Sequence, residues 1–349
     1  MIKLLCAFLL AVAAASVGPA RAQTAPVAFV NARIVPVGNA EGAGAAEIDR
    51  GVLVVHQGRI VAVGPADATA IPPDALRIDC AGKVIMPGLV DTHNHIGGVG
   101  GADGSATLQP DVRVSDSINP LDSGFRRAVA GGLTTLNIMP GSGHLLSGQT
   151  VYVKLRPAKR IDDMIIRDDR GNPMGGMKMA NGTNPMRDPP FAATRGKAAA
   201  MVRDLYTRAQ QYKAKRAAAI QAGGAGAGPD GQDRAPARDL AMEALVEVLD
   251  GSRMVHHHTH RADDIMTVLR LKQEFGFRVT LHHVSEAWKV ADEIAKAGVP
   301  CSVILVDSPG GKLEAAEMSY ETGAVLEKAG VKVAFHTDDW ITDSRLFLR

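Results

Sequence analysis

Short segments in which apolar and polar residues alternate occupy the chain between residues 26 and 83. Such alternation is typical of β-strands that bury one face. It predicts strands at Val27–Val30 and Ala32–Val37, a hairpin over Gly51–Gly64 that turns at Gln57 and Gly58, and a closing strand at Arg77–Cys80. These strands are too short to form an enzyme core, so we expect residues 23–83 to form a small β-sandwich.

After residue 83, apolar runs of strand length alternate with helical patterns, which indicates βα units. The eight strand-like runs are Val84–Val90, Thr134–Ile138, Thr150–Leu155, Met174–Ala180, Met254–His258, Arg278–His282, Cys301–Val306 and Val331–Phe335. The helical patterns lie at 193–221, 239–249, 262–275, 288–297 and 319–329. Residues 223–237 have no apolar pattern and predict a surface loop. The predicted fold class is α/β, with residues 84–349 forming a (β/α)8 TIM-like barrel.

The first residues have the pattern of a leader rather than of a folded element. A basic start at Met1–Lys3 precedes an apolar run from Leu4 to Val17, which is too short to span a bilayer comfortably. Ala20-Arg21-Ala22 then provides a small-x-small cleavage pattern. We expect residues 1–22 to be a signal peptide, an uncleaved anchor being the less favoured alternative. The mature protein is then periplasmic or secreted, without stable membrane insertion.

Composition narrows the classes of function. The chain has 349 residues, of which 46% are hydrophobic and 22% charged, as in a folded globular enzyme. The formal net charge is +2 and aromatic residues make up only 4%, so neither a basic surface nor a base-stacking platform for nucleic acid is indicated. Cys80 and Cys301 lie beside apolar runs, so we expect two buried thiols rather than a disulfide.

The first apolar run of the barrel leads directly into two histidines, His93 and His95. Residues two apart on a strand point to the same face, so both imidazoles are delivered to one side. That arrangement is typical of a metal-ligand pair. The alternative is a pair of exposed loop histidines after a core strand.

Three later runs also end in ligand-type residues. The fifth strand ends in His256, His257 and His258 with His260 beyond, the sixth in His282 and His283, and the eighth in His336, Asp338 and Asp339. The carboxyl ends of barrel strands meet at one face, so these side chains are expected to converge there. Imidazoles with a carboxylate suit zinc or another divalent metal. Each cluster alone would also fit capping or surface histidines.

The segment Pro87-Gly88-Leu89-Val90-Asp91-Thr92-His93-Asn94-His95 resembles the amidohydrolase superfamily, within it the imidazolonepropionase-related group, which includes secreted peptidase-like enzymes. The resemblance runs from about Val27 to the end of the chain. It implies that His93 and His95 form the first-strand metal pair, and that His258 and His283 are the fifth- and sixth-strand ligands. It also implies that Asp338 both binds metal and shuttles the proton.

In members of this superfamily that bind two metals, a carboxylated lysine on the fourth strand bridges the ions. Lys178 is our candidate for that lysine and Lys154 is the rival, since both lie in apolar runs. The amine must lose its proton before it reacts with carbon dioxide, which requires a desolvated site. If neither lysine is modified, one metal and a deaminase reaction become equally well supported.

The loop after the second strand and the histidine beyond the fifth supply candidates for substrate contact: His144, Gln149 and His260. His256 and His257 could support the ligands or touch substrate, and His256 fits a structural role equally well. The partner we expect is a small-molecule or peptide substrate.

The predicted function is hydrolysis of a carbon–nitrogen bond in an amide, peptide or cyclic amide by metal-activated water. The expected cofactor is zinc or another divalent metal, bound as two ions. A divalent metal lowers the pKa of bound water to about 7. Asp338 would act first as general base and then as general acid toward the leaving nitrogen. The alternatives are a single-metal deaminase and an inactive homologue.

The family continues beyond the eighth strand with a helix and further strands that complete the sandwich, whereas this sequence stops at Arg349. We therefore expect a C-terminally truncated chain that lacks the last helix and the closing strands. An uncovered strand edge favours association, so a homo-oligomer is a further expectation.

Overall fold

The computed structural model describes residues 25–38, 46–100, 103–221, 236–304, 311–339 and 342–347. The chain divides into two compact units, Met1–Pro87 and Gly88–Arg349. The predicted signal peptide and most of the predicted loop at 223–237 lie outside the described residues, as do the last two residues of the strand predicted at Cys301–Val306.

The described part of the first unit is one five-stranded sheet in the order β3-β2-β1-β4, with β5 also paired to β1. The strands are β1 (Val27–Ile34), β2 (Ile48–His56), β3 (Arg59–Pro65), β4 (Leu76–Asp79) and β5 (Val84–Ile85). The two strands predicted at Val27–Val30 and Ala32–Val37 are joined in β1, where Asn31 has a positive φ of 61° and the register shifts. The described residues form a single sheet, so the second layer of a sandwich stays a prediction.

The hairpin between β2 and β3 is confirmed. Gln57 and Gly58 have φ angles of 49° and 73°. Positive φ at both central residues is the requirement of a type I′ turn, whose twist matches that of the flanking strands.

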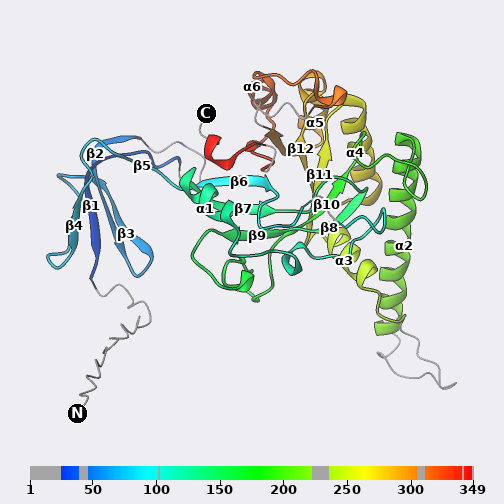
Figure 1. The fold of residues 1–349 in the computed structure, drawn as a ribbon, viewed down its shortest axis with the longest axis horizontal. Coiled ribbons are helices and arrows are strands. Elements are labelled where there is room, and N and C mark those ends of the chain that lie inside the picture. Colours follow the sequence, from blue (N-terminus) through cyan, green and yellow to red (C-terminus); the bar gives the residue numbers. More distant parts are fainter. Residues whose placement is uncertain are drawn as a thin grey trace, which may run out of the picture. The chain divides into compact units, whose positions relative to one another are not determined.

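The second unit contains two sheets and is a mixed α/β fold of TIM-like character (Figure 1). One sheet has the order β14-β13-β12-β11-β10-β8 and the other β6-β7-β9. Their strands are β6 (Leu89–Asn94), β7 (Leu133–Ile138), β8 (Leu146–Gln149), β9 (Val151–Lys154), β10 (Gly176–Ala180), β11 (Met254–Thr259), β12 (Val279–His283), β13 (Cys301–Ile304) and β14 (Val333–His336). The strands from β10 to β14 are parallel, as are β6 and β7.

The strand predicted at Val84–Val90 is instead two strands. Its first residues form β5 in the first unit, and β6 begins only at Leu89. Pro87 lacks an N–H for a ladder. A Cβ added at Gly88 would come within 2.2 Å of the Thr134 side chain, so this position requires glycine for close packing against β7.

The third predicted strand also differs from the expectation. Residues 151–154 form β9, which is antiparallel to β7, and residues 146–149 form the unpredicted β8, antiparallel to β10. An apolar run indicates a buried strand but carries no information on its direction, so the parallel arrangement expected here was wrong.

All but the first of the helices pack on the sheet that contains β10–β13, and the first packs beside β7 in the other sheet (Figure 1). The helices are α1 (Ser123–Ala130), α2 (Arg195–Gln221), α3 (Leu240–Leu249), α4 (Ala262–Phe275), α5 (Ala291–Lys296) and α6 (Thr322–Lys328). The helices predicted at 193–221, 239–249 and 262–275 are confirmed to within two residues, whereas that at 288–297 is a 3₁₀ turn followed by the shorter α5. Helix α1 was not predicted; the carboxylate of Asp122 caps it by accepting from the Gly124 amide at 2.7 Å.

The carboxyl ends of β6 and β14 lie side by side. An isolated bridge pairs Asn94 with Asp339, and the amide of His95 donates to the Asp339 carbonyl at 2.6 Å. The amide of Asp338 donates to the His93 carbonyl at 3.1 Å. The first and last strands of the second unit therefore meet where the sequence places ligand-type residues.

Cys80 and Cys301 are free and buried, as predicted. None of the described helices combines the length and apolar character needed to cross a bilayer.

Candidate metal centre

His93 and His95 project from β6 to one side, and both are buried. The Nδ1 atom of His95 lies 2.7 Å from the Met139 carbonyl oxygen, to which it donates. Its Nε2 atom is on the opposite side of the ring and lies 3.2 Å from His93 Nε2. A carbonyl that fixes one ring nitrogen in this way is the usual support of a metal-binding histidine.

Asp338 completes this first group. Its Oδ1 atom is 3.0 Å from His95 Nε2 and 3.3 Å from His93 Nε2. Burial opposes ionisation, but the hydrogen bond and charge of His95, with His336 and Lys178 nearby, hold the pKa of Asp338 below its usual value. The three residues therefore bring two imidazole nitrogens and a carboxylate to one point.

Lys178 lies in β10 and is fully buried. Its Nζ atom is 2.9 Å from His93 Nε2 and 3.1 Å from the sulfur of Met139. Burial lowers the pKa of Lys178 to about 7, even though Asp338 acts in the opposite direction. The rival Lys154 is exposed and donates to the Thr135 hydroxyl at 2.7 Å, so only Lys178 is brought to the histidines.

A second group consists of His258, His260 and His283, whose ligand atoms lie within 4.8 Å of one another. All three side chains are buried. Both ring nitrogens of His258, and the Nε2 atoms of His260 and His283, have no hydrogen-bond partner among the described residues. Leaving buried polar atoms unpaired costs free energy, so this group needs a ligand to complete it.

His336 connects the two groups. Its Nε2 atom is 3.1 Å from His283 Nδ1, and its ligand atom lies within 4.8 Å of those of His93 and His283. The other ring nitrogen of His336 is 2.7 Å from the Ser302 hydroxyl. No role was predicted for His336 from the sequence, although its position at a strand end, two residues before Asp338, was an available signal.

His282 and His283 both face this region, although successive strand residues normally point to opposite faces. His283 and Val284 have φ angles of 72° and 49°. This left-handed backbone at the end of β12 re-aims His283, while His282 Nδ1 lies 3.2 Å from His93 Nδ1. Such strain in non-glycine residues is concentrated at functional sites.

The protonation of the histidines decides whether this donor set fits a metal. Burial lowers the pKa of His256, His260 and His336 to about 3, and it lowers those of His93, His258 and His283 as well. The imidazoles are therefore neutral near pH 7 and keep a lone pair for coordination. Neutral imidazoles with one carboxylate, several of them unpaired and buried, fit zinc or a similar divalent ion.

The three residues predicted to contact the substrate differ in where they lie relative to the two ligand groups. His260 belongs to the second group of ligand atoms rather than standing apart from it. His144 is buried beside Phe191, with ring centroids 5.6 Å apart, and both of its ring nitrogens are unpartnered among the described residues. The side chain of Gln149 donates to the Pro110 carbonyl at 3.0 Å. Neither His144 nor Gln149 joins the groups of ligand atoms found in the described chain.

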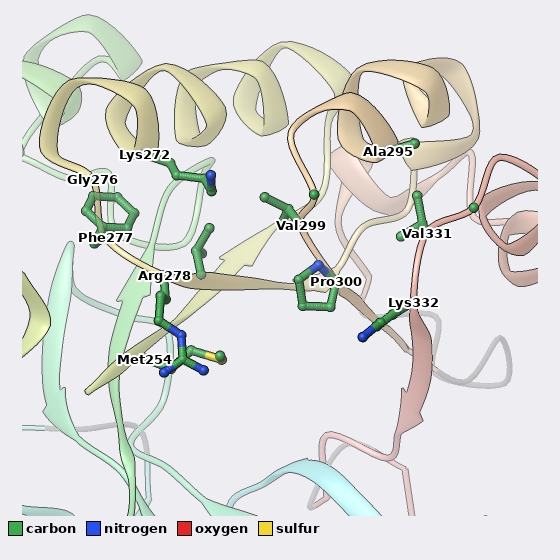
Figure 2. Close-up of a pocket in the computed structure, with 13 residues that line it drawn as sticks. Met254, Lys272, Gly276, Phe277, Arg278, Ala295, Val299, Pro300, Val331 and Lys332 are labelled. Carbon is green, nitrogen blue, oxygen red and sulfur yellow. The ribbon is translucent and has the colours of Figure 1, made fainter. Parts of the chain in front are cut away.

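A pocket of about 470 Å³ lies elsewhere in the second unit (Figure 2). It is lined by residues at or before the starts of β11, β12 and β14, including Met254, Arg278 and Lys332. It therefore opens at the amino ends of these strands, whereas the histidine groups lie toward their carboxyl ends. None of the predicted site residues lines it.

No family model matches the chain. The solved structure of an amidohydrolase from Thermotoga maritima MSB8 is 30% identical, with a TM-score of 0.79, over 91% of this chain and 80% of that one. The chain belongs to the amidohydrolase family.

Two curated amidohydrolase relatives extend this result. Amidohydrolase tasK of Hapsidospora irregularis is 26% identical over 321 residues, which is 84% of this chain but 32% of that protein. An imidazolonepropionase of Rhizobium rhizogenes is 48% identical over 69 residues, 20% of this chain and 16% of that protein. The chain thus spans about a third or less of the length of these curated relatives. The resemblance read from the sequence, including its imidazolonepropionase-related character, is confirmed.

Proposed function

We propose that this chain carries the metal centre of a hydrolase that cleaves a carbon–nitrogen bond in an amide, peptide or cyclic amide. The observation that carries this proposal is the pair of ligand groups, His93–His95–Asp338 and His258–His260–His283, linked through His336. All of these side chains are buried except that of Asp338, which is half-buried. Membership of the amidohydrolase family supports the same reaction class.

The donor set supports two divalent ions, for which zinc is our preferred metal. His93, His95 and Asp338 would hold one ion, and His258 and His283 the other, with His260 within reach. When bound, the metals supply Lewis-acid activation of water, whose pKa falls to about 7, and of the scissile carbonyl group.

Lys178 is our candidate for the bridging ligand. Its buried Nζ atom lies 2.9 Å from His93 Nε2, inside the first ligand group. The neutral amine would attack carbon dioxide and lose one proton, which converts it to a carbamate with two oxygen ligands. A lowered pKa makes the neutral amine available.

The residues of the chain then divide the remaining work. Asp338, as a carboxylate, accepts a proton from the attacking water and returns it to the leaving nitrogen. The Met139 carbonyl holds His95 in one tautomer, and Ser302 holds His336. His144, Gln149 and His260 remain proposed contacts for the substrate.

We also propose that the strands of the second unit close into a barrel. The segment Leu146–Lys154 pairs with β10 through β8 and with β7 through β9, and the Asn94–Asp339 bridge joins β6 to β14. This ring would have one antiparallel member at its third position. A β-sandwich in the first unit would need a second layer beyond the described strands.

Export to the periplasm or medium is a further proposal, based on the leader pattern of residues 1–22. A mature protein that begins at Gln23 by N-terminal sequencing would support it. A cytosolic protein that retains Met1–Lys3 would contradict it.

The proposed function is tested by metal analysis combined with a screen of dipeptides, acylated amino acids and cyclic amides. We expect two ions per chain and hydrolysis of one of these classes. Lys178→Ala should lower metal content and reduce kcat/KM at least about 10- to 100-fold, because a shared ligand is lost. Lys154→Ala is the matched control and should leave both unchanged, since Lys154 is exposed.

Other outcomes would separate the alternatives. One ion, an unmodified Lys178 and release of ammonia from an amine substrate would favour a deaminase. A folded chain without metal and without turnover of any amide would contradict the proposed function.

A further inference from the structure

A line of hydrogen bonds leads away from the first ligand group into the interior of the second unit. His282 Nδ1 lies 3.2 Å from His93 Nδ1, and His282 Nε2 lies 2.9 Å from His256 Nδ1. The line ends at Tyr152, whose hydroxyl lies 2.8 Å from His256 Nε2. All three histidines are buried, and Tyr152 is half-buried.

The backbone at Gly176 leaves space for the His256 ring in this line of hydrogen bonds. A Cβ added to Gly176 would lie 2.2 Å from Cδ2 of His256 and 2.6 Å from the Met254 carbonyl oxygen. Gly176 is two residues before Lys178 on β10, so it occupies the same face. The absence of a side chain at that position is what admits the His256 ring.

The direction of each hydrogen bond follows from the state of His93. Its Nε2 atom faces His95, Lys178 and Asp338, so it is the atom available for a metal. A neutral imidazole has a single N–H, which must then lie on Nδ1. His93 therefore donates to His282 Nδ1.

The same rule fixes the rest of the line. His282 accepts at Nδ1, so it carries its proton on Nε2 and donates to His256 Nδ1. His256 in turn carries its proton on Nε2 and donates to the Tyr152 oxygen. Every bond in the line has one donor and one acceptor in this arrangement, with all rings neutral.

We propose that His282, His256 and Tyr152 are positioning residues, which hold the ring of His93 and its tautomer so that Nε2 faces the metal. This inference rests on the proposed function, because it assigns these residues to the support of that metal centre. It also gives a role to His256, for which the sequence left support, substrate contact and structure open.

The tautomers provide a direct test in the zinc-loaded full chain. Long-range nitrogen–proton correlation spectra of protein labelled with ¹⁵N-histidine should show His256 and His282 both protonated on Nε2. A proton on Nδ1 of either ring would overturn the proposal. This measurement requires no substitution at the site, so it decides even if a variant fails to fold.

Zinc affinity, measured by competition with a chromophoric chelator, provides the second test. His282→Leu should weaken zinc binding about 10- to 100-fold, since a supporting partner of a ligand is removed. His282→Gln should recover part of the loss, because its amide oxygen can accept from His93 Nδ1. Tyr152→Phe should weaken zinc binding by a smaller factor. The matched control is Tyr206→Phe, which should leave zinc affinity unchanged. The Tyr206 hydroxyl donates to the Met179 sulfur at 3.3 Å and takes no part in the line of hydrogen bonds from His93.

The outcomes distinguish this inference from the proposed function. Wild-type zinc affinity in His282→Leu and Tyr152→Phe would overturn the positioning role alone. A wild-type chain that takes up no zinc would overturn the proposed function and, with it, this inference.

Discussion

Gly176 determines how much space the buried histidines of the second unit have. It is the first residue of β10, and the nearest atoms to an added Cβ belong to the His256 ring and to the backbone of Met254. Backbone cannot move aside as an exposed side chain can, so a methyl group at this position must displace the ring or part the strands.

We therefore predict that Gly176→Ala lowers the free energy of unfolding by about 1–3 kcal/mol, as overpacking of a core does. Chemical denaturation followed by circular dichroism measures this change. Gly196→Ala is the control: no atom lies within 4 Å of its added Cβ, and it sits in α2, where alanine is favoured by about 0.5–1 kcal/mol. Equal stability of Gly176→Ala and wild type would show that the ring has room to move.

At the residue scale, two kinds of site residue differ in how readily a sequence shows them. His93 and His95 were predictable because two-residue spacing on a strand fixes a shared face. Lys178 and Lys154 could not be separated, since burial decides between them and both lie in apolar runs. Strand alternation could not show that His282 and His283 face the same region, because the left-handed backbone at His283 overrides that alternation.

At the scale of elements, Asp91 ties β6 to the segment that follows β14. Its carboxylate accepts from the Thr337 hydroxyl at 2.6 Å and the Thr337 amide at 3.1 Å. It also accepts from the Asn94 side chain at 2.8 Å. Asp91 is completely buried, so these donors have no access to water when the carboxylate is removed.

Asp91→Ala is accordingly expected to lower the free energy of unfolding by at least about 3 kcal/mol, because each buried donor left unpaired costs about 1–3 kcal/mol. A thermal or urea melt provides the measurement. Asp168→Ala is the control, since Asp168 accepts a similar set of bonds from Arg170 and Asn172 but is exposed, and it should change stability by less than about 1 kcal/mol. Similar losses in the two variants would contradict a special role for Asp91.

Helices and strands were predictable from the sequence where the spacing of apolar residues and the length of the pattern define them. The helices α2, α3 and α4 are long, and their apolar spacing located them to within two residues. Strand direction is not encoded in that spacing, which is why the antiparallel β8 and β9 were missed. The helix α1 spans only eight residues and was not predicted.

At the scale of the whole molecule, binding of the proposed metals should stabilise the folded state. A ligand that binds only the folded state stabilises it by about 2.7 kcal/mol at 100 times its Kd. We predict that removal of metal with a chelator lowers Tm by several degrees and that added zinc restores it, as differential scanning calorimetry would record. An unchanged Tm, in protein shown by elemental analysis to gain and lose zinc, would contradict this coupling.

The general architecture of the second unit followed from the sequence because strands and helices alternate along most of it. The convergence of His93, His258, His283 and Asp338 followed from the rule that strand ends share a face. The division of the chain after Pro87 depends on packing between remote segments, such as Gly88 against Thr134, which no local pattern reports.

The meeting of β6 with β14 has a consequence for the growing polypeptide on the ribosome. Asp338 is added about 240 residues after His95, which at about 5–20 residues per second means a delay of about 12–50 s. Throughout that delay the two imidazoles of β6 are without their carboxylate partner. An ion of the proposed metal captured by the nascent chain would meet an incomplete set of donors, so we expect loading with that metal to follow translation.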